Sequence, residues 1–163
     1  MNDNLQFQQA KTMIASIQWK DYDTIGGNAA ESAIWHTLDG RQWITPNVEI
    51  LLRVLFSENI DAALDASHEL WNCLCHQGQT ASADLPAYDI LLLGVRSLTE
   101  PLKVELMDIL YNIIGGIPKS DLSTPWKLEL RTKFARDRWF FQTLTNSKNE
   151  DIAAFAELIL DQL

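Results

Sequence analysis

Cysteine, histidine and long uncharged apolar runs are scarce in this sequence of 163 residues. The two cysteines, Cys73 and Cys75, would point in different directions on a helix, so a disulfide between them is not expected. A chain without disulfides is typical of a reducing compartment, and residues 1–4 lack the basic start and apolar stretch of a signal peptide. We therefore expect a cytoplasmic protein. Arg53 and Arg96 interrupt or end the two most apolar stretches, so no contact with a membrane is expected.

Basic residues are also scarce, with 13 Lys and Arg against 22 Asp and Glu and a formal net charge of −9. An acidic surface repels phosphate, so direct binding of nucleic acid is not expected. Residues 1–100 hold 5 basic and 13 acidic residues, whereas residues 101–163 hold 8 and 9. The acidity of the first part serves solubility, and it also fits a surface that attracts a basic protein partner.

The composition favours one folded domain over residues 1–163. Hydrophobic residues make up 47% of the chain, which argues against disorder. A length of 163 residues suits one domain with a sizeable core.

Apolar residues recur with helical spacing along nearly the whole chain, and no segment alternates with period two for long enough to predict a strand. The expected fold class is therefore all-α, with seven or eight helices. Asn28 is expected to cap the second of them. The expected helices cover residues 4–19, 29–38, 45–56, 60–76, 85–97, 99–114, 123–146 and 149–163.

Short loops join these helices into antiparallel pairs, at about residues 46–77, 85–115 and 125–163. Pairs of this length, stacked side by side, describe a right-handed α-solenoid. A compact helical bundle is the alternative, because sequence identity between the pairs is weak.

Residues 69–78 read Glu-Leu-Trp-Asn-Cys-Leu-Cys-His-Gln-Gly, and residues 83–92 read Ala-Asp-Leu-Pro-Ala-Tyr-Asp-Ile-Leu-Leu. This pattern resembles a HEAT-like group of bacterial proteins, in which a helix ends in a His-Gln-Gly turn and the next helix opens with small residues and a proline. Residues 19–30, with Trp19 and Gly27-Asn28-Ala29, are similar to the first repeat of those proteins. The resemblance implies a stack of HEAT-like repeats and the function of an immunity protein paired with a secreted bacterial toxin.

The histidines and cysteines near residue 75 do not predict a metal site. A zinc site usually needs two pairs of ligands at loop or turn spacing, and Cys73, Cys75 and His76 form one set at a helix end with His68 nearby. Two buried cysteines and a surface histidine are the better interpretation. We expect no metal and no cofactor.

No catalytic constellation is predicted either. Cys75 and His76 are adjacent, so on a helix their side chains diverge by about 100° and do not form a nucleophile–base pair. No nucleophile, base and orienting group fall together elsewhere, and the chain is not expected to be an enzyme.

Three acidic residues on one predicted helix are the first candidate for a partner-binding site. Asp61, Asp65 and Glu69 repeat every four residues and form one stripe, extended by His68 and Asn72. The ordinary interpretation is that the stripe is the solvent-exposed face of an amphipathic helix. Like charges four residues apart repel, however, and this helix carries no Lys or Arg to offset them. We therefore favour a surface that faces a partner.

A second candidate lies in the loop before Gly26-Gly27. A tyrosine flanked by two acidic residues, as in Asp21-Tyr22-Asp23, is a good contact group for a basic protein, although an ordinary loop has the same composition. The basic cluster at residues 127–138 is expected to pair with acidic residues of the same protein or of a neighbouring subunit. It is not expected to bind nucleic acid.

These observations predict an immunity protein that binds and neutralises a cognate toxin through an acidic surface. A nuclease is one candidate for that toxin, because an enzyme that attracts phosphate needs a basic groove. The alternative is a general helical-repeat adaptor with a different cellular partner.

Overall fold

The structure of the chain is a computed structural model that describes residues 3–121 and 123–163. Helices dominate these residues, as predicted from the periodicity, and their number agrees with the prediction. The helices are α1 (Asp3–Ser16), α2 (Val48–Leu55), α3 (Ile60–Cys75), α4 (Asp84–Ser97), α5 (Glu100–Gly115), α6 (Pro125–Arg136), α7 (Arg138–Leu144) and α8 (Glu150–Gln162). None of the described helices combines the length and the apolarity needed to cross a bilayer.

The prediction of an all-α fold was wrong for residues 23–45, which form two small antiparallel sheets. One sheet pairs β1 (Asp23–Thr24) with β2 (Gly27–Asn28), and the other pairs β3 (Ala33–His36) with β4 (Gln42–Thr45). Asn28 does not cap a helix. Its side-chain amide donates to the Lys20 carbonyl, and its side-chain oxygen accepts the Ala30 amide in a turn. The helix predicted over residues 29–38 is therefore replaced by a turn and a strand.

The single helix predicted for residues 123–146 is also wrong, because Asp137 separates α6 from α7. Asp137 has φ −95° and ψ 10°, outside the regular helix, and its side chain is buried. Apolar residues continue at helical spacing across this position, so the periodicity alone does not mark the break.

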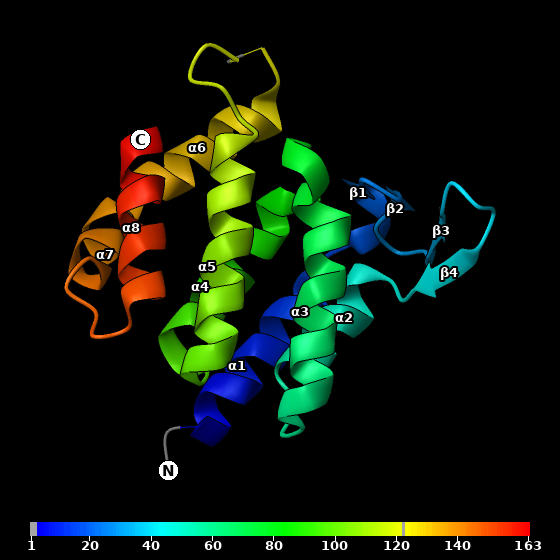
Figure 1. Cartoon of the computed structure of the whole chain (residues 1–163), viewed down its shortest axis with the longest axis horizontal. Helices are drawn as coiled ribbons and strands as arrows, with labels where there is room; N and C mark the ends of the chain where they lie inside the picture. The colour runs from blue at the N-terminus through cyan, green and yellow to red at the C-terminus, as the bar shows by residue number, and fades with distance from the viewer. Residues whose placement is uncertain (1–2, 122) are drawn as a thin grey trace.

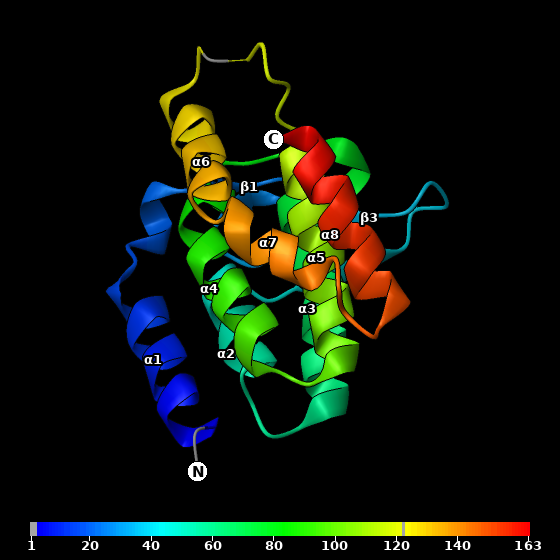
Figure 2. The ribbon, with the colours of Figure 1, turned by 90° about the vertical axis from the view of Figure 1, so that its left-hand side faces the viewer.

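The helices pack in an order that follows the chain. α2 packs on α3, α4 on α5, and α7 on α8, while α5 lies between α3 and α8 (Figure 1). α1 contacts α2 and α4 on the other side, which Figure 2 shows beside α4. One cluster of buried side chains runs through these interfaces, and its largest fully buried members include Tyr88, Phe134, Phe141, Leu70 and Met107.

The C-terminal end of α3 and the segment that follows it anchor the first small sheet. After α3, the His76–Gly78 turn has positive φ at Gln77 (55°) and Gly78 (74°). Beside it, the Ile25 amide donates to the Cys73 carbonyl at 2.9 Å. The Asp23 amide also donates to the Ser82 hydroxyl at 2.9 Å. Segments far apart in the sequence are thereby joined at the C-terminal end of α3.

Candidate partner-binding surface

The β3–β4 hairpin has two faces that point in opposite directions and carry different side chains. Its register pairs Ala33 with Thr45, Ile34 with Ile44, Trp35 with Trp43 and His36 with Gln42. Because side chains alternate between the faces of a strand, the two tryptophans share one face, and the two isoleucines share the other with the exposed His36 and Gln42. The hairpin extends away from the helical body (Figure 1), so the direction of each face decides what it contacts.

The tryptophan face is fixed to α3 by hydrogen bonds and ring contacts. The Trp35 indole N–H donates to the Thr45 hydroxyl at 2.9 Å, and this hydroxyl donates to the Glu69 carboxylate at 2.7 Å. Thr45 is 1% exposed, so this chain of bonds is shielded from water at its centre. Trp35 stacks on Trp43 with ring centroids 6.1 Å apart, and it lies 6.4 Å from the His76 ring. The hairpin is therefore held in a defined position against α3.

The isoleucine face is open to solvent. Ile34 is 57% exposed and its cross-strand neighbour Ile44 is 69% exposed. Leu38, in the turn between the strands, is fully exposed. At the same tip, Asp39 accepts hydrogen bonds from Thr37 and, at 2.9 Å, from Arg41, which neutralises both charges locally. The exposed aliphatic side chains of the hairpin are therefore the Ile34–Ile44 pair and, beyond the polar pair His36 and Gln42, Leu38 at the tip.

Carboxylates without basic partners are concentrated in the part of the sequence that contains this hairpin. Residues 23–76 contain eight Asp and Glu against two arginines, a net charge of −6. Arg41 pairs with Asp39, and Arg53 pairs with Glu49 at 2.8 Å. Within the described part of the chain, no Lys or Arg lies within 4.0 Å of the other six. These six carboxylates belong to Asp23, Glu31, Glu58, Asp61, Asp65 and Glu69.

The acidic stripe predicted on α3 meets the hairpin at Glu69. Asp61 and Asp65 are exposed, and Asp61 lies in the first turn, where the helix dipole stabilises a negative charge. Glu69 is half-buried because it accepts the hydrogen bond from Thr45. Asn72 is also half-buried, and its side-chain oxygen lies 3.1 Å from Nδ1 of His76.

His68 is exposed on α3, three positions after Asp65 and four before Asn72. Its Nε2 lies 3.4 Å from the Glu105 carboxylate, so the ring points toward α5. Residues three and four positions apart share one face of a helix, so His68 extends the stripe toward α5.

The structure separates Tyr22 from the acidic stripe. Asp21 lies in a short 3-10 helix (Trp19–Asp21), and Asp23 lies in β1. Tyr22 is half-buried and lines a pocket of about 280 Å³ with Met13 of α1, Leu85 of α4 and Lys133 of α6. Its ring therefore faces the opposite group of helices from α3, and the two predicted sites do not form one continuous patch through this side chain.

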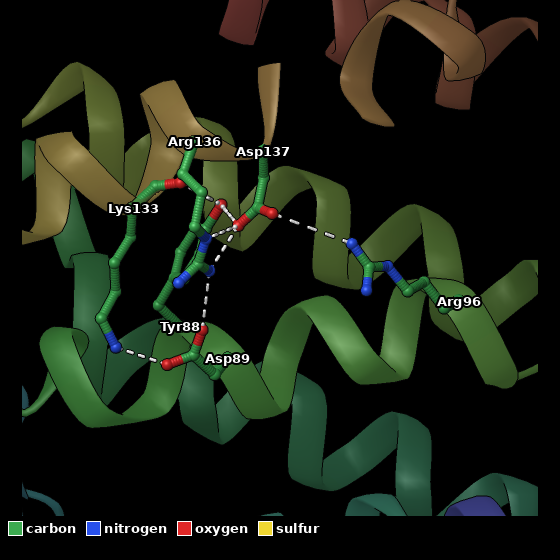
Figure 3. Close-up of polar contacts among 6 residues, drawn as sticks. All are labelled: Tyr88, Asp89, Arg96, Lys133, Arg136 and Asp137. Atoms are coloured by element: carbon green, nitrogen blue, oxygen red, sulfur yellow. Dashed lines mark hydrogen bonds and ion pairs between the residues drawn. The ribbon is translucent and has the colours of Figure 1, made fainter. Parts of the chain in front are cut away.

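The basic cluster pairs within the molecule, as predicted. Lys133 and Arg136 both bind the Asp89 carboxylate, and Arg136 also binds Asp137 at 2.6 Å (Figure 3). Burial acts to raise the pKa of Asp89, but the hydrogen bonds and positive charges of Lys133 and Arg136 outweigh it and hold the pKa below its usual value. Lys127 pairs with Asp121 at 2.6 Å. This region therefore offers less free charge than its composition suggests.

Both cysteines are buried, as predicted. Cys73 is 2% exposed and Cys75 is 0% exposed. Burial, with a smaller contribution from Glu69, raises the pKa of the Cys73 thiol to about 12. Burial raises the pKa of Cys75 as well, and its thiol lies 3.5 Å from the Trp71 carbonyl. Neither thiol is exposed enough to act as a surface nucleophile.

The hairpin side chains that complete this surface were not predicted from the sequence. A signal was present, because Asp39-Gly40 is a typical turn dipeptide and lies between two short runs rich in β-branched and aromatic residues. Gly40 has φ +83°, a conformation that glycine adopts without strain. The four-residue strands were too short for the alternation to stand out from the helical spacing around them.

Comparison of the chain with protein-family models, with curated proteins and with solved structures finds no significant match.

Proposed function

We propose that this protein binds a basic protein partner and neutralises it by stoichiometric contact, as a bacterial immunity protein does. The carrying observation is the set of six carboxylates in residues 23–76 that have no Lys or Arg partner in the described chain; the same segment holds a hairpin with exposed isoleucines, which one of the carboxylates, Glu69, contacts. Protein-binding surfaces commonly place apolar side chains at the centre and polar or charged ones around them. In this proposal the chain has no catalytic role.

The charge of the surface indicates the kind of partner. A negative surface attracts a positive one and accelerates its association. Enzymes that act on nucleic acids must themselves attract phosphate, so their active-site grooves are basic. A nuclease toxin, with its groove covered by the acidic surface, fits both requirements. The resemblance of residues 69–92 to HEAT-like immunity proteins supports the same function.

The packing of the helices supports a HEAT-like α-solenoid as part of this proposal. Three antiparallel units follow one another in chain order, namely α2 with α3, α4 with α5, and α6–α7 with α8. The second helices of these units, α3, α5 and α8, contact one another in the same order. Helix pairs that stack on their neighbours are the building principle of HEAT-like proteins.

A general helical-repeat adaptor is the alternative, and it would use the same surface. Immunity proteins can bind their toxins with some of the highest affinities known, whereas adaptors bind far more weakly. A toxin gene next to the gene for this protein, and tight co-purification of the two products, would favour immunity. A weakly bound cellular partner would favour the adaptor.

The proposal is tested by reversing charge on α3 without disturbing the hairpin. Asp61 and Asp65 are both exposed, whereas Glu69 holds Thr45 and is left intact. The Asp61→Lys, Asp65→Lys variant is compared with a matched variant of α8, Glu157→Lys, Asp161→Lys. The α8 residues are also exposed and also four positions apart. The two variants carry the same net charge and differ only in where the charge lies.

The measured quantity is the association rate with the protein encoded by the adjacent gene. We expect the α3 variant to associate at least about tenfold more slowly at low salt, with a difference that shrinks as ionic strength rises. The α8 variant should associate nearly as the wild type does. Equal slowing by both variants would show that only the net charge matters. No slowing by either variant would show that the stripe is an ordinary solvent-exposed face.

A further inference from the structure

The open face of the β3–β4 hairpin has no counterpart in the helical body. Ile34 and Ile44 lie directly opposite each other, are more than half exposed, and stand on the side of the hairpin turned away from α3. The polar pair His36 and Gln42 follows on the same face toward the tip, and the fully exposed Leu38 lies in the turn beyond it. A directly opposed pair of exposed isoleucines, with an exposed leucine at the tip of the same hairpin, is more than the single exposed apolar residues that cover ordinary surfaces.

Packing within the chain does not require this face to be apolar. The hairpin is already fixed by its other side, through the Trp35–Thr45–Glu69 hydrogen bonds and the stacked tryptophans. Threonine has the same branching at Cβ as isoleucine and would suit an exposed strand equally well. Apolar side chains here therefore suit a contact outside the chain.

The charges around the hairpin select the partner that can cover it. Glu69 contacts the hairpin itself, and Asp65 and Asp61 lie one and two helical turns before it in α3. Glu31 precedes β3. The α3 carboxylates lie on the tryptophan side of the hairpin, whereas the isoleucines face away from α3, so these charges act on a partner of the isoleucine face by long-range attraction. A second copy of this chain would carry the same net negative charge, and like charges oppose association. A protein with an apolar pocket in a positively charged surface would be attracted by the carboxylates and would cover the isoleucines.

We infer that the β3–β4 hairpin is the anchor of the binding surface, with Ile34, Leu38 and Ile44 seated in an apolar pocket of the basic partner. This inference rests on the proposed function and adds its mode of contact. The acidic stripe steers the partner during encounter, and the buried hairpin side chains hold it afterwards. The two parts of the surface therefore act on different rates, since charge governs association and buried apolar contacts govern dissociation.

The test replaces the apolar face while keeping the strands. In the Ile34→Thr, Ile44→Thr variant both positions stay β-branched, and Trp35, Trp43 and Thr45 are untouched. The matched control is Leu128→Gln, Leu158→Gln, which removes two exposed leucines (46% and 41%) from α6 and α8. These helices lie on the opposite side of the molecule from the hairpin (Figure 1). A Leu38→Ser variant at the tip checks the result independently of strand stability.

The dissociation constant for the protein encoded by the adjacent gene should rise at least about tenfold in the hairpin variant, mainly through faster dissociation. Leu38→Ser should also weaken binding, and the control variant should bind as the wild type does. The inference would be overturned if both hairpin variants bound with wild-type affinity while the α3 charge variant associated more slowly. That result would still support the proposed function. Absence of binding by the wild type would remove both.

Self-association is the competing use of this face. Light scattering of the free protein should give a monomer for the wild type and for the hairpin variant. A wild-type dimer that becomes a monomer in the Ile34→Thr, Ile44→Thr variant would assign the face to a second copy and overturn the inference.

Discussion

The Thr45 hydroxyl donates a 2.7 Å hydrogen bond to the Glu69 carboxylate and thereby joins the end of β4 to the middle of α3. The same hydroxyl accepts the Trp35 indole N–H at 2.9 Å. One buried oxygen therefore fixes both strands of the hairpin relative to the acidic stripe. The relative position of the apolar and the charged parts of the surface depends on this contact.

Thr45→Val should loosen the hairpin while keeping its shape, because valine has the size and branching of threonine but no hydroxyl. The Trp35 N–H loses its acceptor and Glu69 loses its donor, which should cost about 1–3 kcal/mol of stability. Hydrogen exchange of residues 33–45 and urea unfolding measure the effect. Thr132→Val on the exposed face of α6 is the matched control and should leave hydrogen exchange of residues 33–45 unchanged. Unaltered exchange in the Thr45 variant would contradict this role.

Trp71 should contribute to stability through its packing and not through its N–H group. Its ring packs on the core and lies edge-on to the His76 ring at 5.2 Å, but its Nε1 is buried without an acceptor among the described residues. Trp71→Ala should therefore destabilise the fold by about 3 kcal/mol, while Trp71→Phe should cost less than half as much. Chemical denaturation of both variants checks the ranking, and equal losses would show that the N–H group has a partner.

Substitutions at Tyr88 and at Asp137, two members of one polar network (Figure 3), should lower the stability of the fold by different amounts. The buried Tyr88 hydroxyl donates to Asp137 at 3.1 Å, while Arg136 and Arg96 also reach this carboxylate. Tyr88→Phe removes one donor and leaves Asp137 compensated, so we expect a loss of about 1 kcal/mol. Asp137→Ala leaves the Tyr88 hydroxyl with only the Lys133 carbonyl at 3.4 Å and removes the contacts of Arg96 and Arg136 with this carboxylate at the break between α6 and α7, so its loss should be larger. Urea unfolding curves that rank the variants in the opposite order would refute this account.

The buried carboxyl group of Asp84 should make stability depend on pH. Asp84 is 0% exposed and lies at the start of α4; one oxygen accepts the Ala81 amide, and the other has no partner in the described chain. Burial raises the pKa of this carboxyl group well above its usual value of 3.8. The folded state therefore holds a proton that the unfolded state has released above about pH 4.

The sign follows from that difference in bound protons. The stabilising contribution of protonated Asp84 is complete below the unfolded pKa, and it is lost as pH rises toward the folded pKa, at up to about 1.4 kcal/mol per pH unit. Asp84→Asn cannot ionise, so its stability relative to the wild type should increase as pH rises. Urea unfolding between about pH 5 and pH 8 measures the difference. The exposed Asp161→Asn variant is the control and should track the wild type. A constant difference between Asp84→Asn and the wild type would show that Asp84 is ionised in the fold.

Local residue patterns were enough to predict most of the helices and their ends. Asn59 and Asn149 accept backbone amides at the N-termini of α3 and α8, as their positions before apolar helical repeats predict. Pro101 and Pro125 lie in the first turns of α5 and α6. The acidic stripe on α3 was also predictable, because residues four positions apart share one face of any helix. These features depend on neighbours within a few positions of the chain.

Features that join distant segments were decided by the tertiary structure. Residues 33–45 form a hairpin because α3 supplies Glu69 and His76 to its tryptophan face, and an isolated pair of four-residue strands is barely stable in water. Asp137 ends α6 because Tyr88 and Arg96, more than 40 positions away, meet its carboxylate. Hydrophobic spacing records which face of a segment is buried, but it does not record which distant polar group lies opposite. For that reason the sequence determined the helices and the acidic stripe, whereas tertiary contacts decided where the chain leaves the helix and places an apolar hairpin beside that stripe.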